Sequence, residues 1–168
     1  MYMLRCFLFA LLVLAVSSCT TTYYFVRHAE KACEDCLTCG LQIPDGSNRA
    51  MALADSMDNK GVDNIFASQC VRTQETAIPL SDRINKQIDI YQTEDLEEFI
   101  AVLKGYTDNR SILIVGHSNQ VPVMIESIAN RQVTIDSEDF DNLFIIRKRR
   151  FLTTTIQFES KTYGVPTP

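Results

Sequence analysis

The chain has 168 residues, of which 46% are hydrophobic and 22% are charged. This length and composition fit a single globular domain with one core and leave no room for a second. The formal net charge of −5 provides no basic surface to hold a phosphate backbone, so we expect no nucleic acid partner.

The chain begins with the pattern of a secretory signal. Arg5 precedes an unbroken apolar run over Phe7–Val16, which is too short for a spanning helix of about 20 residues. The tetrapeptide that ends at Cys19 resembles a bacterial lipobox, in which cleavage precedes a cysteine that is then lipidated. We therefore predict a signal peptide over residues 1–18 and a domain over 19–168, anchored in the bacterial cell envelope through lipidated Cys19. The alternative is an ordinary signal peptide that is cut nearby.

Four further cysteines belong to the domain. Cys33, Cys36 and Cys39 are spaced like metal ligands, and Cys70 lies further along the chain. An even number of cysteines in an exported protein favours disulfides. A zinc site completed by Cys70 is the second interpretation, and free thiols are the third.

Short apolar runs alternate with amphipathic stretches through the domain. The expected strands cover 23–26, 64–67, 88–91, 111–115, 143–146 and 151–158, and the expected helices cover 48–57, 73–84, 94–103 and 119–129. Pro79 is expected to kink the second helix, and Ser118 is the predicted N-cap of the last. We expect Arg147–Arg150 to form a solvated turn between the last two strands, in preference to a contact with anionic lipid headgroups.

This alternation predicts an α/β domain with a largely parallel sheet covered on both faces. Ligands of such sheets bind beyond the carboxyl ends of the strands. The first predicted strand runs into Arg27 and His28, the second is followed by Arg72, and the fourth runs through Gly116 into His117. We therefore expect two arginines and both histidines of the chain to meet at one edge of the sheet.

These four side chains have the chemistry of a site for a phosphoryl group. Guanidinium groups bind phosphate oxygens with paired planar donors. A neutral imidazole can accept a phosphoryl group as nucleophile, and a second imidazole can donate to a non-bridging oxygen. Any one of the four is more often structural, so the prediction depends on all four meeting. No carboxylate cluster with metal-ligand spacing accompanies them, and we expect neither a metal nor a cofactor.

The sequence around these residues resembles the histidine phosphatase superfamily, also called the phosphoglycerate mutase-like family. Tyr24–Lys31 contains Arg-His-Ala, a variant of the family signature Arg-His-Gly. Ser68-x-x-x-Arg72-Thr73 is similar to the second block of the family, and Val115-Gly116-His117-Ser118-Asn119 to the third. Gly46-x-x-Arg49-Ala50 matches a helix start between the first two blocks. The blocks follow the family's order from about residue 23 to residue 158.

The resemblance implies a three-layer α/β/α sandwich and hydrolysis of phosphomonoesters through a phosphohistidine intermediate. His28 would be the phosphorylated nucleophile, Arg27 and Arg72 would bind the phosphate, and His117 would complete the pocket. A small phosphorylated molecule would be the substrate.

The acid that protonates the leaving group is not marked by these motifs. The larger acid-phosphatase branch has Asp where this chain has Ser118. The mutase-like branch supplies its acid from the middle segment, where this chain has Glu94, Asp95, Glu97 and Glu98. Asp95 is our choice, because it lies at a predicted helix start after a strand. The chain also has Glu75 where the family often has Gln, and its cysteine-rich insertion is expected at the rim of the site.

The same fold is compatible with other functions. A phosphoglycerate mutase is disfavoured by the export signal and the short chain. A lipoprotein that binds a phosphate ligand without catalysis is the alternative from another class. A protein-phosphohistidine phosphatase fits the small size but acts in the cytoplasm. The oligomeric state cannot be read from the sequence.

Overall fold

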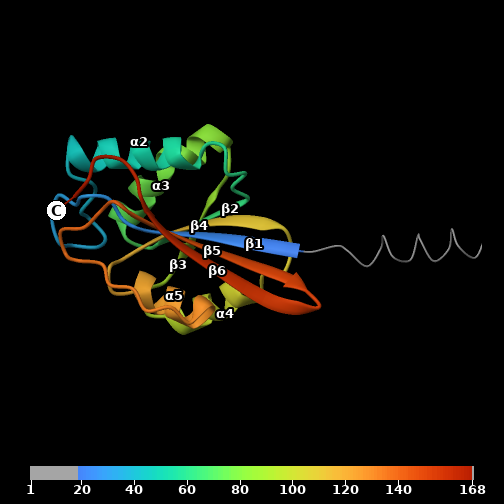
Figure 1. Ribbon diagram of the computed structural model, residues 1–168. Coiled ribbons are helices and arrows are strands. Elements are labelled where there is room, and N and C mark those ends of the chain that lie inside the picture. The colour runs from blue at the N-terminus through green and yellow to red at the C-terminus, as the bar shows by residue number, and fades with distance from the viewer. Residues whose placement is uncertain (1–18, 168) are drawn as a thin grey trace, which may run out of the picture.

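The computed structural model describes residues 19–167, which form a six-stranded sheet between two pairs of helices (Figure 1). The strands are β1 (Cys19–Arg27), β2 (Asn64–Ser68), β3 (Ile88–Tyr91), β4 (Arg110–Gly116), β5 (Asn142–Phe151) and β6 (Thr153–Thr162). The helices are α2 (Asp45–Met57), α3 (Val71–Ile84), α4 (Leu96–Gly105) and α5 (Val121–Ala129). Within this part of the chain, no helix is both long and apolar enough to cross a bilayer.

The sheet has the order β3-β2-β4-β1-β5-β6. The first four strands in this order pair in parallel, whereas β1 pairs with β5 and β5 with β6 in the antiparallel sense. The three-layer α/β/α class is therefore correct, but the sheet is mixed and only its first half is parallel. The physical reason is that the segment after α5 carries the chain back to the end of β1, where its carbonyls contact Arg27, so β5 starts where the parallel strands finish. A direct hairpin then makes β6 antiparallel to β5.

Both faces of the sheet are buried against helices, as Figure 1 shows, with α2 and α3 on one side and α4 and α5 on the other. Along β4, Ile112 and Ile114 pack into the cluster beneath α4 and α5, while Leu113 and Val115 pack beneath α2 and α3. A strand buried on both faces must be apolar at every position, which is why this run was readable from the sequence. Both clusters consist of residues from Tyr23 onward.

The predicted turn Arg147–Arg150 is wrong. These residues continue β5, and they pair with Cys19–Thr22 on one side and with Thr154–Gln157 on the other. The reversal occurs at Leu152, which has a φ of +38°. Here the hairpin extends beyond both cores, so long charged side chains are tolerated on a strand that solvent reaches.

Helix starts also differ from expectation. α4 begins at Leu96 with Asp95 as its N-cap, and α5 begins at Val121 with Gln120 as its N-cap in place of Ser118. α3 continues through Pro79. The predicted signal peptide over residues 1–18 lies outside the described residues.

Candidate active site

The ends of β1 and β4 bring the two histidines together. The two strands pair with Arg27 opposite Gly116, and the backbone N–H of His28 donates to the carbonyl of Gly116 at 2.9 Å. The ring centroids of His28 and His117 are 5.3 Å apart. The adjacent parallel strand β2 leads through Cys70 into α3, whose first turn carries Arg72.

A cavity of about 390 Å³ opens at this edge of the sheet. The loops after β1, β2, β3 and β4 all contribute to it, as expected for a parallel sheet. Its lining is predominantly polar and includes all four residues of the predicted site: Arg27, His28, Lys31, Cys36, Gln69, Cys70, Arg72, Thr93, Glu94, His117, Ser118, Asn119 and Gln120.

The His28 ring is held in one tautomer. Its Nδ1 lies 2.7 Å from the carbonyl oxygen of Ala29, which can only accept, so Nδ1 carries the proton and Nε2 keeps its lone pair. Burial, together with the positive charges of Arg27 and Arg72 and the closeness of the His117 ring, lowers the pKa of His28 to about 3. At neutral pH the ring is therefore uncharged, with Nε2 able to act as a nucleophile.

His117 is oriented by Ser68, whose Oγ lies 2.8 Å from Nε2 of the ring. Ser68 Oγ also accepts from the backbone N–H of Cys70, while the Thr73 hydroxyl has the carbonyls of Ser68 and Cys70 as acceptors. The Thr73 hydroxyl, 2.9 Å from Ser68 Oγ, and Nε2 of His117 are the two acceptors open to the Ser68 proton. When Ser68 donates to Nε2, Nδ1 of His117 bears the ring proton. Burial and then the charges of Arg72 and Arg27 lower the pKa of His117 to about 4.

Arg27 is fixed by backbone carbonyls. Its Nη1 donates to the carbonyl oxygens of Asp136, Ser137 and Asp139 at 2.7–3.1 Å, and its guanidinium carbon lies 4.0 Å above the Phe140 ring. Its Nε is buried and has no protein partner. A buried guanidinium N–H without an acceptor is costly, and an anion in the cavity could satisfy it.

Arg72 is arranged in the same way. Its Nη1 donates to the carbonyls of Glu34 and Asp35, in the cysteine-rich loop after β1, and its Nε is also buried without a partner. Two cationic groups at the cavity are thus held by carbonyls that do not neutralise them, and each has a donor unused.

The cysteines form disulfides, as the sequence favoured, between Cys33 and Cys39 and between Cys36 and Cys70. Cys36 and Cys70 both line the cavity, which confirms the expected place of the insertion at its rim. The Cys36–Cys70 bridge joins the loop that holds Arg72 to the N-cap of α3. Within residues 19–167, no cluster of three or more His, Cys, Asp or Glu side chains is placed to hold a metal ion.

The structure does not bring Asp95 into the site. Asp95 is exposed at the N-cap of α4, and the residue before it, Glu94, lines the cavity instead. Glu94 is the one carboxyl group among the described lining residues, and it accepts a hydrogen bond from Gln69 at 3.2 Å. Glu75 is also outside the cavity, because its carboxylate accepts the backbone N–H of Leu41.

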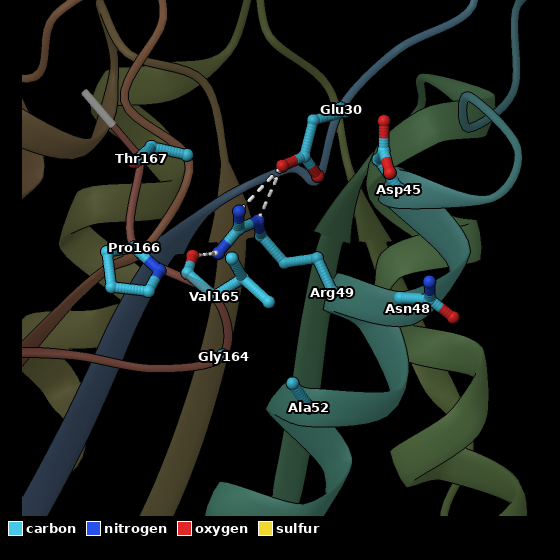
Figure 2. Close-up of a pocket in the computed structure, with 9 residues that line it drawn as sticks. All are labelled: Glu30, Asp45, Asn48, Arg49, Ala52, Gly164, Val165, Pro166 and Thr167. Carbon is cyan, nitrogen blue, oxygen red and sulfur yellow. Dashed lines mark hydrogen bonds and ion pairs between the residues drawn. The ribbon is translucent and has the colours of Figure 1, made fainter.

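A second cavity of about 380 Å³ lies between α2 and the C-terminal segment (Figure 2). There the Arg49 guanidinium reaches across to the Glu30 carboxylate, with Nε and Nη2 at 2.8 and 2.7 Å from the same oxygen, and donates through Nη1 to the carbonyl of Val165. Since Glu30 follows His28 by two residues, this ion pair fixes the loop that carries the histidine. Gly46 belongs to the same arrangement, because a Cβ there would clash with the backbone oxygen of Glu30.

Sequence reasoning did not find Ser68 as the partner of His117, nor Phe140 and the carbonyls before it as the support of Arg27. Ser68 lies in the second block, so its position was visible but its role was not. The segment 136–140 has no motif and reaches the site through a loop after α5.

The sequence of this chain matches the model of a known protein family. A model of the histidine phosphatase superfamily, branch 1, matches residues 23–108, which contain Arg27, His28 and Arg72. The match ends before the third block, which contains His117. No curated protein sequence matches the chain.

Solved structures of low sequence identity share the fold. SixA of Nakamurella multipartitia, named as a phosphohistidine phosphatase, is 17% identical with a TM-score of 0.60, over 88% of this chain and 96% of that one. A SixA structure with tungstate is 13% identical with a TM-score of 0.67, over 84% and 96% of the two chains. A mycobacterial glucosyl-3-phosphoglycerate phosphatase is 10% identical with a TM-score of 0.63, over 88% and 100%. Because the family model spans just over half of the 168 residues, the chain belongs to the histidine phosphatase superfamily, branch 1, and is a phosphatase.

Proposed function

We propose that this phosphatase hydrolyses phosphomonoesters through a phosphohistidine at Nε2 of His28, without a metal ion. The observation that carries the proposal is the pair of buried guanidinium groups with unused Nε donors, beside an imidazole whose Nδ1 is engaged by the Ala29 carbonyl. An anion that fills the cavity would meet donors from Arg27 and Arg72 while its phosphorus faces an uncharged nucleophile.

The first step transfers the phosphoryl group. Nε2 of His28 forms a bond to phosphorus, the bond from phosphorus to the ester oxygen breaks, and the alcohol leaves with a proton from the cavity wall. Arg27, Arg72 and the protonated Nδ1 of His117 stabilise the negative charge on the non-bridging oxygens. In the second step water attacks phosphorus, the P–N bond breaks, and inorganic phosphate leaves with the original nucleophile restored.

Glu94 replaces Asp95 as our proposed proton donor to the leaving alcohol. Glu94 lines the cavity, and its carboxylic acid can donate a proton to the leaving oxygen in the first step. The resulting carboxylate can accept a proton from the attacking water in the second step. Gln69 and Thr93 lie beside it and hydrogen-bond to each other at 2.8 Å, which restricts this part of the wall.

Trapping of the phosphoenzyme in alkaline detergent tests the nucleophile. We expect the wild-type protein to acquire acid-labile, base-stable label from a 32P-labelled phosphomonoester, and His28→Ala to acquire none and to lose turnover. Arg27→Ala and Arg72→Ala should weaken binding of inorganic phosphate as well as turnover. Turnover that survives His28→Ala would refute the mechanism. Phosphate binding without turnover in the wild-type protein would instead favour a binding lipoprotein, and loss of activity on dialysis against a chelator would refute metal independence.

The role of Glu94 is tested with leaving groups of different basicity. Glu94→Gln should slow hydrolysis of an alkyl phosphate by about 10²- to 10⁴-fold, the usual contribution of a positioned acid. It should slow p-nitrophenyl phosphate much less, because that leaving group needs little protonation. Asp95→Asn is the matched control and should leave both rates within about twofold. Equal losses on the two substrates would assign Glu94 a role in binding rather than in proton transfer.

The proposed substrates are small phosphorylated molecules, and the proposed location is the bacterial cell envelope. Two solved structures with this fold are named for phosphohistidine and for a sugar phosphoglycerate, so a screen should include a phosphohistidine peptide beside sugar phosphates and nucleotides. Cys19 is proposed as the lipid anchor. Incorporation of labelled fatty acid that is lost in Cys19→Ala would support this anchor, and incorporation that persists would contradict it.

A further inference from the structure

The amino end of β1 lies beside the tip of the β5–β6 hairpin. In the register of the sheet Cys19 pairs with Arg150, and the hairpin continues through Phe151 and reverses at Leu152. Figure 1 shows this tip projecting next to the point where the chain enters β1. At about 3.3 Å per residue, Leu152 reaches roughly 7 Å further along the strand direction than Cys19 does. We define the hairpin tip as residues 147–156.

The hairpin tip is basic in an acidic protein. It contains Arg147, Lys148, Arg149 and Arg150 and no acidic residue, although the whole chain has a formal charge of −5. Lys104, exposed at the end of α4, adds to the group, because its carbonyl accepts a hydrogen bond from the Lys148 ammonium. Burial, and then the nearby charges of Arg150 and Lys104, lower the pKa of Lys148.

Acidic groups near this tip are largely engaged. Glu159 pairs with Arg147 at 3.1 Å and with Lys161 at 2.9 Å, and Asp108, in the loop before β4, pairs with Arg110 at 2.6 Å. Glu159 offsets the charge of Arg147, so the positive charge of the tip is concentrated around Arg150.

The apex of the hairpin tip is apolar. Leu152 is 96% exposed, and Phe151 beside it is 37% exposed. Ile156, which pairs with Lys148 further back along the hairpin, is 42% exposed. A leucine with almost no contact to its own protein makes no contribution to the core. An apolar apex followed by a belt of arginine and lysine is the arrangement by which peripheral proteins enter the boundary between lipid headgroups and acyl chains.

We propose that the hairpin tip docks on an anionic lipid bilayer, with Leu152 and Phe151 inserted between the headgroups and Arg147–Arg150 against them. The docking proposal depends on the proposed function at one point, which is the lipid anchor at Cys19. That anchor would hold the end of the molecule that carries the hairpin tip at the bilayer. The carboxyl ends of the parallel strands are at the opposite end of the sheet (Figure 1). The eight-residue rise from Cys19 to Arg27 places the phosphate cavity about 26 Å from the membrane side. Docking would therefore hold the cavity open to solvent, facing away from the lipid.

A second copy of this chain and an acidic protein are the other possible occupants. Strand β6 is an edge of the sheet and could pair with its counterpart in another molecule. The lipid surface is favoured, because the tip pairs with Cys19, the proposed lipid anchor, and an acylated Cys19 would hold the tip at the bilayer.

Vesicle sedimentation tests docking independently of the anchor. The chain from Thr20 retains both hydrophobic clusters and every helix of the fold, so it serves as an unlipidated protein. We expect it to bind phosphatidylcholine vesicles that contain phosphatidylglycerol and to bind pure phosphatidylcholine weakly. Arg149→Gln with Arg150→Gln should lower the partition coefficient on anionic vesicles about thirtyfold, and Leu152→Ser should lower it several-fold.

Lys161→Gln is the matched control, because it removes one positive charge from the far end of the same hairpin, where Lys161 pairs with Leu143. It should change the partition coefficient by less than about twofold, whereas Arg150→Gln alone should lower it about fivefold. Phosphatase activity in solution should be unchanged in all these variants. Absence of binding to anionic vesicles, or binding that Arg149→Gln with Arg150→Gln leaves unaltered, would overturn the proposal. So would light scattering that shows a dimer dependent on Leu152. Failure of Cys19 to acquire lipid would refute the anchor and leave the vesicle result to decide docking.

Discussion

The disulfide between Cys36 and Cys70 is expected to stabilise the fold more than its neighbour between Cys33 and Cys39. A cross-link lowers the entropy of the unfolded chain, and the reduction grows with the logarithm of the number of residues in the loop that it closes. The two bridges close loops with sequence separations of 34 and 6 residues. The chain-entropy relation then gives about 3.8 kcal/mol for Cys36–Cys70 and about 2.2 kcal/mol for Cys33–Cys39 at 25 °C.

The perturbation is a pair of double variants, Cys36→Ser with Cys70→Ser and Cys33→Ser with Cys39→Ser. Urea unfolding should show the larger loss of free energy for the first, and its melting temperature should fall by about 8–15 °C. Each variant serves as the matched control of the other, because both replace two cysteines by serine and remove one bridge from the cysteine-rich loop. Equal losses, or a larger loss for Cys33→Ser with Cys39→Ser, would refute the reasoning from loop length.

The same bridge should affect catalysis through Arg72. Opening Cys36–Cys70 releases the loop whose Glu34 and Asp35 carbonyls hold the guanidinium. We expect KM for a phosphomonoester to rise in Cys36→Ser with Cys70→Ser by more than in the other pair. Inhibition by inorganic phosphate, measured under conditions where both variants remain folded, separates weaker anion binding from partial unfolding.

Three further predictions follow from buried polar groups and close contacts. In the folded protein the pKa values of His28 and His117 are about 3 and about 4, below the ordinary value of 6.5. Between these values and pH 6.5 the unfolded chain therefore binds more protons than the folded protein does. Stability should fall as the pH drops from 6.5 toward 4, by up to about 1.4 kcal/mol per histidine per pH unit, and unfolding of His28→Asn should show a shallower dependence. The Tyr163 hydroxyl is buried without a partner, so Tyr163→Phe should raise the free energy of unfolding by up to about 1 kcal/mol. A fall in the free energy of unfolding by more than about 1 kcal/mol would show instead that the hydroxyl makes a stabilising hydrogen bond. Gly46→Ala should lower it by about 1–3 kcal/mol, because the new Cβ meets the backbone oxygen of Glu30, which cannot move freely; thermal unfolding beside Gly105→Ala, where no atom lies within 4 Å, provides the comparison.

The parallel half of the fold could be predicted because three of its four strands, β1, β2 and β4, contain an uninterrupted apolar run. Ile112 to Val115 face both helical layers in turn, and a run of that kind admits few other structures. The basic residues of β5 misled the prediction, since charge was taken to mark a turn. In the structure this stretch is held by the backbone ladder to β1, and a hydrogen-bond ladder leaves no trace in side-chain composition.

The candidate site was predictable where residue type and strand ends coincide, as for Arg27, His28 and His117. Asp95 and Glu94 are adjacent and chemically alike, so only the angle at which α4 leaves the strand decides which of them faces the cavity. The supports of the two arginines could not be found either, because they are backbone carbonyls, which every residue has. The roles of these residues remain predictions until the variants are measured.

The place of β1 has a consequence for the order in which the chain can fold. β1 is the first strand to be synthesised, yet its neighbours are β4 and β5, and Thr21 pairs with Arg110 on one side and with Lys148 on the other. A fragment that ends before β4 would leave β1, one of the two central strands, with both edges unpaired, so the native sheet cannot form until most of the polypeptide has been made. Contacts so distant in sequence slow the search for the native sheet, and the nascent chain lacks that sheet for most of its synthesis; a chain without its native sheet can still be threaded through a membrane channel.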